Sequence, residues 1–289
     1  MTRRHQTDET CGIATAAGVV GDWWTLLVLR EIARGHVRFD GLAHELGLSR
    51  KVLSERLATL TEHQVLERRP YQERPTRHEY VLTERGRGLI PVLVSLQDWA
   101  DRWVLGDGTL TGNADPEGGG SARVHQLVGT RVPEDPELPG TDGGLHSTVA
   151  PDARATVLFA YPATGVPGGP PRPDVPGAAG CTLENRLFRD AWPRFEAAGL
   201  AVRGVSTQTP REQADFARAE DLPFLLLSDD RLRLAAALRL PTFRSGQDLR
   251  LKRLILIVDA QRTVRHALFP VTDIPAAVEE ALALAAALP

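Results

Sequence analysis

The stretch GLAHELGLSRKVLSERLATLT (residues 41–61) contains two helical patterns joined by a tight turn. Leucines at helical spacing precede Gly47, which is expected to end a short helix, and Ser49 is positioned to cap a second helix over residues 50–61. Apolar side chains recur on one face of that second helix: Val52, Leu53, Leu57 and Leu60. A short helix, a glycine-containing turn and a further helix form the helix-turn-helix pattern.

The flanking sequence extends this motif to a winged helix. Residues 22–34 have apolar side chains on one helical face, which predicts a helix before the motif. After the motif, VLERRPY (65–71) and HEYVLT (78–83) predict a hairpin around QERPTR, and one long amphipathic helix is expected over residues 84–103.

In winged helices the second helix of the motif enters the major groove, and the wing contacts phosphate or the minor groove. Polar side chains on both elements are therefore expected to meet double-stranded operator DNA: Ser49, Arg50, Lys51, Ser54 and Arg56 on the helix, and Arg68, Arg69, Arg74 and Arg77 on the hairpin. Arginine suits both guanine recognition and phosphate binding. The alternative is a solvated charged face, since four glutamates dilute the basic residues: Glu55, Glu62, Glu67 and Glu73.

Length and composition place this motif in a larger globular protein. The chain has 289 residues, which predicts two domains, and its 42% hydrophobic and 25% charged residues exclude disorder and fibrous repeats. The net charge of −3 gives no global sign of nucleic-acid binding. No apolar run approaches the roughly 20 residues that cross a bilayer, and no signal-peptide core is visible, so we expect a cytoplasmic protein without a membrane partner.

A glycine-rich polar run, GDGTLTGNADPEGGGS (106–121), is typical of a flexible connector. We therefore expect a winged-helix domain over residues 1–105, a linker over 106–122 and a second domain over 123–289. In the second domain, five β-rich segments (155–161, 200–206, 223–228, 253–259 and 263–269) alternate with four helical ones (183–198, 211–220, 231–238 and 274–288). This order predicts a layered α/β sheet, whose ligand sites gather where strands end and helices begin.

The two cysteines, Cys11 and Cys181, are too few for a disulfide framework. Cys181 opens the predicted helix after PGAAG, where backbone N–H groups and the helix dipole would lower its thiol pKa and favour thiolate. The alternative for either cysteine is a packed small apolar residue. No metal and no other cofactor are expected, because the eight histidines show no ligand spacing with the cysteines.

Three segments in the first half carry a family resemblance: residues 11–42, 46–60 and 65–100. They include a cysteine at the start of the first helix, the GDWWT that leads into the second, and a P-x-x-x-EY-x-LT wing. They resemble the HxlR-type transcriptional regulators. The resemblance implies a homodimeric DNA-binding protein with a dimer interface of terminal helices, and in some family members the cysteine that matches Cys11 senses oxidants or electrophiles. The apolar stripe of the last helix suits that interface: Leu89, Val92, Leu96, Trp99 and Trp103.

The second half resembles the peroxiredoxins, which have a thioredoxin-like fold, over nearly all of residues 124–289. The segments that carry this resemblance are YP (161–162), GCT-x-E-x-x-x-FRD (180–190), GVSTQ (204–208), LPFLLLSD (222–229) and LKRLILIVD (251–259). The resemblance implies that Cys181 is the peroxidatic cysteine, Arg253 the arginine that holds thiolate and peroxide, and Pro162 the proline after the first core strand. The fold class is then α/β and α+β in two domains, an N-terminal winged helix-turn-helix and a C-terminal thioredoxin-like domain.

The second half also departs from the peroxiredoxin pattern. Ala178 stands where the family has a hydroxyl residue three positions before the cysteine, so the hydroxyl that would orient peroxide comes from Thr164, from Thr182 or from neither. The domain has no second cysteine. Resolution of oxidised Cys181 would require Cys11, the Cys181 of another subunit or an external thiol.

These observations favour a redox-responsive transcriptional regulator in which Cys181 reacts with a peroxide or a related oxidant. One alternative is a thiol peroxidase with an autoregulatory DNA-binding domain, which peroxide consumption at catalytic protein levels would reveal. Another is a regulator whose thioredoxin-like domain is redox-inactive and binds a ligand or supports dimerisation, which unchanged DNA affinity after peroxide would reveal.

Overall fold

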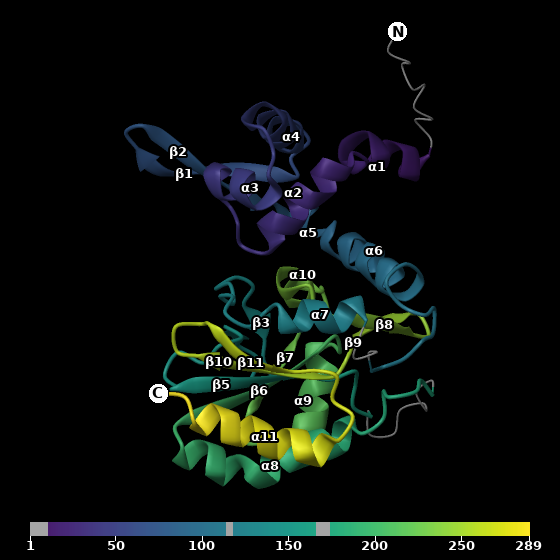
Figure 1. Ribbon diagram of the computed structural model, residues 1–289, viewed down its shortest axis with the longest axis vertical. Coiled ribbons are helices and arrows are strands. Elements are labelled where there is room, and N and C mark those ends of the chain that lie inside the picture. Colours follow the sequence, from purple (N-terminus) through teal and green to yellow (C-terminus); the bar gives the residue numbers. More distant parts are fainter. Residues whose placement is uncertain (1–10, 114–117, 166–173) are drawn as a thin grey trace. The chain divides into compact units, whose positions relative to one another are not determined.

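The computed structural model describes residues 11–113, 118–165 and 174–289 (Figure 1). Packing divides the chain into two compact units, Met1–Leu93 and Val94–Pro289. The division falls inside a helix rather than in the glycine-rich run 106–121, because the second half of that helix packs with the second unit.

The first unit contains the helix-turn-helix that residues 41–61 predict. Gly47 ends the first helix of the motif in a left-handed conformation with φ of 61°, and the Ser49 hydroxyl accepts a hydrogen bond from the Val52 N–H at 3.3 Å. Buried leucines from the motif pack with the preceding helix around Val28 and Leu29. The elements up to the division are α1 (Gly12–Val20), α2 (Trp23–Ala33), α3 (Phe39–Leu46), α4 (Arg50–Glu62), β1 (Leu66–Glu73), β2 (Thr76–Leu82), α5 (Glu84–Arg87) and the start of α6 (Ile90–Trp103).

Two details of this unit differ from the sequence-based expectations. The hairpin strands pair as far as Glu73 and Thr76, so most of the expected connection QERPTR belongs to the strands. The prediction of a single helix over residues 84–103 is wrong, because the chain forms two helices, α5 and α6, with a break at Gly88 and Leu89. Pro91 explains the break: it has no N–H to bond the carbonyl of Arg87, but it suits the first turn of a new helix.

The second unit is built on a five-stranded sheet of order β11-β10-β5-β6-β7. Strands β5 to β7 are parallel, while β10 pairs antiparallel with both β5 and β11. The elements are α7 (Gly119–His125), β3 (Leu138–Pro139), β4 (Leu145–His146), β5 (Ala155–Ala160), α8 (Cys181–Ala197), β6 (Leu200–Ser206), α9 (Pro210–Ala219), β7 (Leu225–Ser228), α10 (Arg233–Leu238), β8 (Thr242–Ser245), β9 (Asp248–Leu251), β10 (Leu254–Asp259), β11 (Val264–Leu268) and α11 (Ile274–Ala286). This sheet confirms the predicted thioredoxin-like α/β class.

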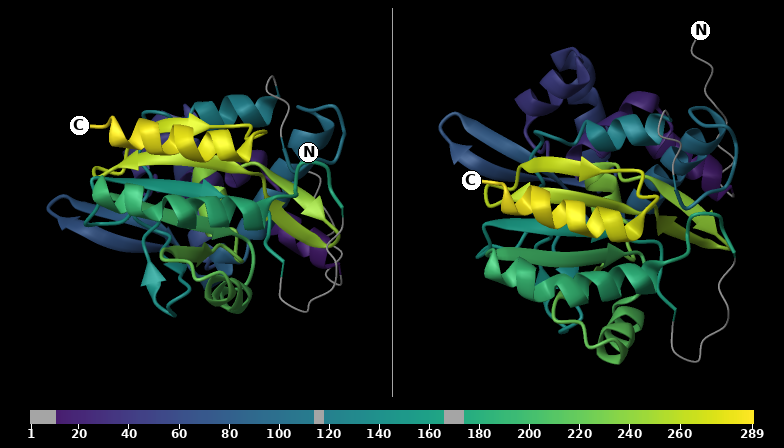
Figure 2. Two further views of the ribbon diagram at one scale, coloured as in Figure 1. Left: turned by 90° about the horizontal axis from the view of Figure 1, so that it is seen from below. Right: turned by 60° about the horizontal axis from the view of Figure 1, so that its bottom comes forward.

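Helices α8 and α11 lie side by side against one face of the sheet (Figures 1 and 2). Their apolar residues pack with the sheet in one aromatic core, where the Phe159 and Phe188 rings stack with centroids 4.3 Å apart. The all-buried strand β5 ends in this core and leads directly to Tyr161 and Pro162. The core therefore fixes the end of β5 and the first turn of α8 next to each other.

Within the described residues, no single helix is long and apolar enough to cross a membrane. The bent pair of α1 and α2 passes a test of length and composition alone, but Val28, Leu29 and Ile32 of α2 are buried in the first unit.

Candidate functional site

Cys181 is the first residue of α8 and follows a sharp turn at Gly180. Its side chain packs in the core that α8 shares with the sheet. The preceding Gly180 has a φ of 95°, a conformation that favours glycine, and a Cβ there would lie 2.6 Å from the Ile274 Cδ1 atom. Cys181 is only 4% exposed. The sequence-based position of this cysteine at a helix start is confirmed, and the burial is an additional feature.

Three groups surround the sulfur. Arg253 Nη2 donates to Cys181 Sγ at 3.5 Å, the backbone N–H of Ala163 also donates to it, and the thiol itself donates to the Ala178 carbonyl at 3.4 Å. Arg253 lies just before β10 and is 1% exposed. The structure thus brings together the two residues that the peroxiredoxin resemblance paired, Cys181 and Arg253.

Arg253 is held from several sides, and one partner was not assigned a role from sequence. Its guanidinium donates to the carboxylate of Glu184 and, at 2.7 Å, to the carbonyl of Ala179. Glu184 lies one helical turn after Cys181 and is fully buried, and its Oε1 atom has no hydrogen-bond partner in the described part of the chain. The sequence contained a signal for this role of Glu184: it is the glutamate in GCT-x-E, three residues after the cysteine and so on the same face of the helix.

Burial raises the pKa of the Cys181 thiol; the positive charge of Arg253 opposes this effect, and the Glu184 carboxylate adds to it. The net direction is upward, so the predicted lowering of the pKa of Cys181 is wrong for this buried conformation. The physical reason is that desolvation of a thiolate outweighs one guanidinium whose charge is shared with a carboxylate. Burial also raises the pKa of Glu184 to about 7, against the effect of Arg253.

The other site residues predicted from sequence are Thr164, Thr182 and Pro162. Thr164 is fully buried, and its hydroxyl and N–H both donate to Gln208 Oε1, at 3.1 and 2.8 Å. The Thr182 hydroxyl makes no hydrogen bond within the described ranges, and Pro162 is buried after β5. The Thr164 hydroxyl is therefore directed to Gln208, a residue that sequence reasoning missed.

On α4 the predicted DNA-contacting side chains differ in exposure. Lys51 and Ser54 are exposed, and Arg50 is 75% exposed with its guanidinium 3.0 Å from Asp40. Arg56 is 31% exposed and lies 3.3 Å from Asp22, the N-cap of α2. Both arginines therefore pair within the first unit, and Arg56 is the least exposed of the predicted DNA-contacting residues on this helix.

All four predicted arginines of the hairpin are exposed: Arg68, Arg69, Arg74 and Arg77. Arg68 contacts His78 and Arg69 pairs with Glu67. Arg38, which was not predicted from sequence, stacks on the Tyr71 ring at 4.2 Å and pairs with Glu79, so it braces the hairpin against the motif.

Among the described residues, one group has metal-ligand side chains close together: Glu31, His36 and Glu45. Arg30 and Arg34 already bind the two carboxylate oxygens of Glu31. This group is therefore an ion-pair cluster.

Comparison with known proteins agrees with both halves of this description. The HxlR-like helix-turn-helix family model matches residues 19–107, and the AhpC/TSA family model matches residues 175–267. The HTH-type transcriptional regulator YvaP of Bacillus subtilis is 36% identical over 101 residues, which are 35% of this chain and 94% of YvaP. The chain belongs to the HxlR family. Its C-terminal half contains the segment that matches the AhpC/TSA family model and has a peroxiredoxin-like fold.

Two further comparisons describe the range of similar proteins. The HTH-type transcriptional regulator Rv3095 of Mycobacterium tuberculosis is 46% identical over 92 residues, which are 32% of this HxlR-family chain and 58% of Rv3095. The chain thus spans little more than half the length of that regulator. Among solved structures, peroxidoxin BcpB from Mycobacterium tuberculosis is 29% identical with a TM-score of 0.47, over 56% of this chain and 97% of that chain.

The contacts of Arg253 lead to a first prediction. Replacing Arg253 with Met removes the main group that favours the Cys181 thiolate, so alkylation of Cys181 by iodoacetamide at pH 7 should slow by about tenfold or more. Stopped alkylation reactions followed by intact-protein mass spectrometry measure the rate. The matched control is Arg186→Met, which removes a surface arginine of α8 that pairs with Glu220. Equal rates in both variants would remove Arg253 from the control of this thiol.

Proposed function

We propose that this protein is a redox-responsive DNA-binding transcriptional regulator in which Cys181 reacts with a hydroperoxide or a related oxidant. The observation that carries the proposal is the joining, in one chain, of an HxlR-family helix-turn-helix to an AhpC/TSA-family domain whose cysteine contacts a buried arginine. The protein is proposed to bind an operator duplex and a second copy of itself, and to react with the oxidant and an external thiol.

The proposed chemistry begins at the sulfur. The Cys181 thiolate attacks one oxygen of the hydroperoxide, the O–O bond breaks, and the sulfur becomes a sulfenic acid while the leaving oxygen departs as an alcohol or water after taking up a proton. Arg253 and the Ala163 N–H lie where they can stabilise the negative charge on the leaving oxygen. A reductant thiol then forms a disulfide with Cys181 and releases water.

Two features favour a sensor over a fast peroxidase. Burial raises the pKa of the Cys181 thiol, which lowers the thiolate fraction at neutral pH. The hydroxyl of Thr164 is directed to Gln208 rather than to the sulfur. Both features slow turnover, but neither prevents a single oxidation that changes DNA affinity.

DNA binding is proposed for the exposed end of α4 and for the hairpin. The variant Arg50→Ala with Lys51→Ala should weaken specific binding by ~1–3 kcal/mol for each contact that reads a base. Arg56→Ala should weaken it less, because the Arg56 side chain is only 31% exposed, against 75% for Arg50. Anisotropy titration against a duplex selected from a random-sequence library measures these affinities, and Arg211→Ala, at a 93% exposed arginine of α9, is the control. Wild-type affinity in the double variant would contradict the assignment of α4 as the recognition helix.

A homodimer is proposed at α6. Its apolar stripe is exposed in the single chain: Val92 50%, Leu96 48%, Trp99 57% and Trp103 57%. Side chains of this size rarely stay in water as a continuous stripe, and a two-fold dimer would bury them and present two recognition helices.

Replacing Trp99 with Glu should therefore place a charge in the dimer contact and shift the protein to a monomer at micromolar concentration. Light scattering after size exclusion measures the mass. The control is Leu183→Glu, a 47% exposed residue of α8. A dimer mass that persists in Trp99→Glu would exclude this helix as the interface.

The central experiment measures affinity for the selected duplex before and after one equivalent of hydrogen peroxide. Wild type and Cys11→Ser should change affinity several-fold, and Cys181→Ser should not respond. Unchanged affinity in oxidised wild type would support the redox-inactive alternative. Many turnovers of peroxide per protein with an added dithiol would support the peroxidase alternative.

A further inference from the structure

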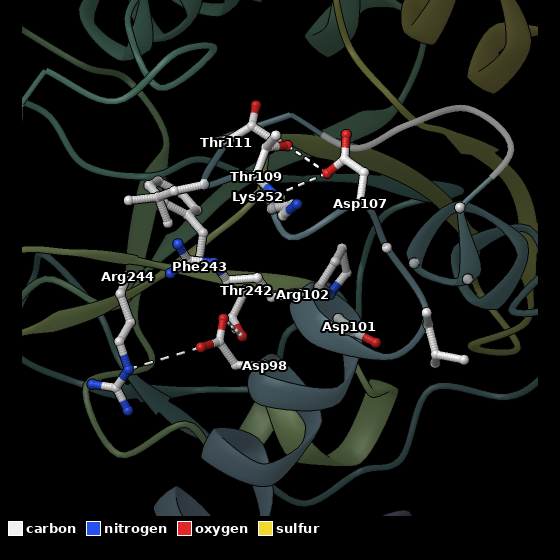
Figure 3. Close-up of a pocket in the computed structure, with 17 residues that line it drawn as sticks. Asp98, Asp101, Arg102, Asp107, Thr109, Thr111, Thr242, Phe243, Arg244 and Lys252 are labelled. Atoms are coloured by element: carbon white, nitrogen blue, oxygen red, sulfur yellow. Dashed lines mark hydrogen bonds and ion pairs between the residues drawn. The ribbon is translucent and has the colours of Figure 1, made fainter.

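The connector between the two family domains is fastened to the loop that carries Cys181. The N–H of Gly112 donates to the Pro176 carbonyl at 2.7 Å, and the Thr111 hydroxyl donates to the same oxygen at 3.1 Å. Lys252, next to Arg253, donates to the Asn113 carbonyl at 2.9 Å. Thr111 and Lys252 line one cavity of about 370 Å³ (Figure 3).

The contact is a close approach of two backbones. A Cβ on Gly112 would lie 2.7 Å from the N atom of Ala178, and one on Gly177 would lie 2.9 Å from the N atom of Asn113. Gly177 also has a φ of 77°, which favours glycine. The connector therefore packs closely against this loop, and neither Gly112 nor Gly177 leaves room for a side chain of its own.

The same connector follows the part of α6 that belongs to the second unit. Gln97 donates to the Leu240 carbonyl at 2.9 Å, and Arg123 binds the Asp101 carboxylate at 2.8 Å. Arg244 and Asp98 both line this cavity, and the Arg244 Nε atom lies 3.8 Å from the Asp98 Oδ2 atom (Figure 3). The end of α6 and the loop of Cys181 are thus joined through residues 104–113 by short, direct contacts.

Chemistry at Cys181 must disturb this arrangement. At 4% exposure the sulfur cannot be reached by a second thiol unless its surroundings move, and residues 176–180 directly precede it and contact it through the Ala178 carbonyl. The carbonyls of Ala178 and Ala179 bind the thiol and Arg253, so formation of a bulky disulfide breaks these contacts too. Displacement of Pro176 then removes the acceptor of both Gly112 and Thr111.

We propose that residues 111–113 are a latch that is closed on the reduced Cys181 loop and opens when Cys181 forms a disulfide with an external thiol, which frees the end of α6. The chemistry of this proposal rests on the proposed function: hydroperoxide oxidises the thiolate to sulfenic acid with loss of an alcohol or water, and the thiol displaces water from it. Because the latch and the cysteine are coupled, modification of Cys181 must favour the open latch, and opening the latch must favour modification of Cys181.

The test measures this reciprocity in the full-length protein. In one arm, wild type is converted to the Cys181 mixed disulfide with hydrogen peroxide and glutathione, and amide hydrogen exchange is followed in residues 108–113. Exchange there should accelerate about tenfold or more when the latch opens. Cys181→Ser under the same treatment should show no change.

In the other arm the latch is opened by substitution, and alkylation of reduced Cys181 by iodoacetamide is timed. Gly112→Ala, which forces the backbones apart, should accelerate alkylation by about tenfold, and Thr111→Val by less. Thr111→Ser and Gly165→Ala should react like wild type, since the first keeps the hydroxyl and a Cβ at Gly165 meets no atom within 4 Å. If Gly112→Ala does not fold, Thr111→Val against Thr111→Ser decides this arm.

Unchanged exchange in residues 108–113 of the mixed disulfide, or wild-type alkylation rates in the folded latch variants, would overturn the latch. Failure of the proposed function has a different signature. In that case either no mixed disulfide forms or wild-type DNA affinity ignores it, while alkylation of reduced Cys181 is still accelerated in the latch variants.

Discussion

The buried guanidinium of Arg253 is the constraint on which the site around Cys181 depends. A charge at 1% exposure is stable only when several acceptors surround it, and here these are the Glu184 carboxylate, the Ala179 carbonyl and the Cys181 sulfur. Satisfying this one group fixes the first turn of α8, the loop before it and the start of β10 relative to one another. The position of the sulfur is a consequence of this requirement.

The same burial that orders the site restrains its reactivity. Desolvation raises the pKa of Cys181, and Glu184, with a pKa raised to about 7, shares the charge of Arg253. A cysteine in this environment is shielded from solvent and is held mainly as the thiol. The contacts of the loop before α8 therefore matter as much for access to Cys181 as those of the sulfur itself.

Much of the architecture was predictable because it depends on local pattern. Leucine spacing, Gly47 and Ser49 were sufficient for the helix-turn-helix, since capping and a left-handed turn act within a few residues. Alternating buried strands and amphipathic helices were likewise sufficient for the α/β layers. The prediction of one helix over residues 84–103 was wrong because the continuous apolar stripe suggested a single helix, whereas Pro91 breaks it.

The sequence by itself therefore determined the two fold classes, the pairing of an HxlR-type motif with a peroxiredoxin-like domain, and the placing of Cys181 at a helix start. Only the tertiary structure decided that the thiol is buried, that Glu184 shares Arg253, that Gln208 holds Thr164 and that Gly112 closes on the loop of Cys181. The physical reason is distance along the chain. Helices, caps and turns arise from neighbours, whereas desolvation and shared hydrogen bonds depend on residues 44 to 75 positions apart that meet only when the sheet and its helices have packed.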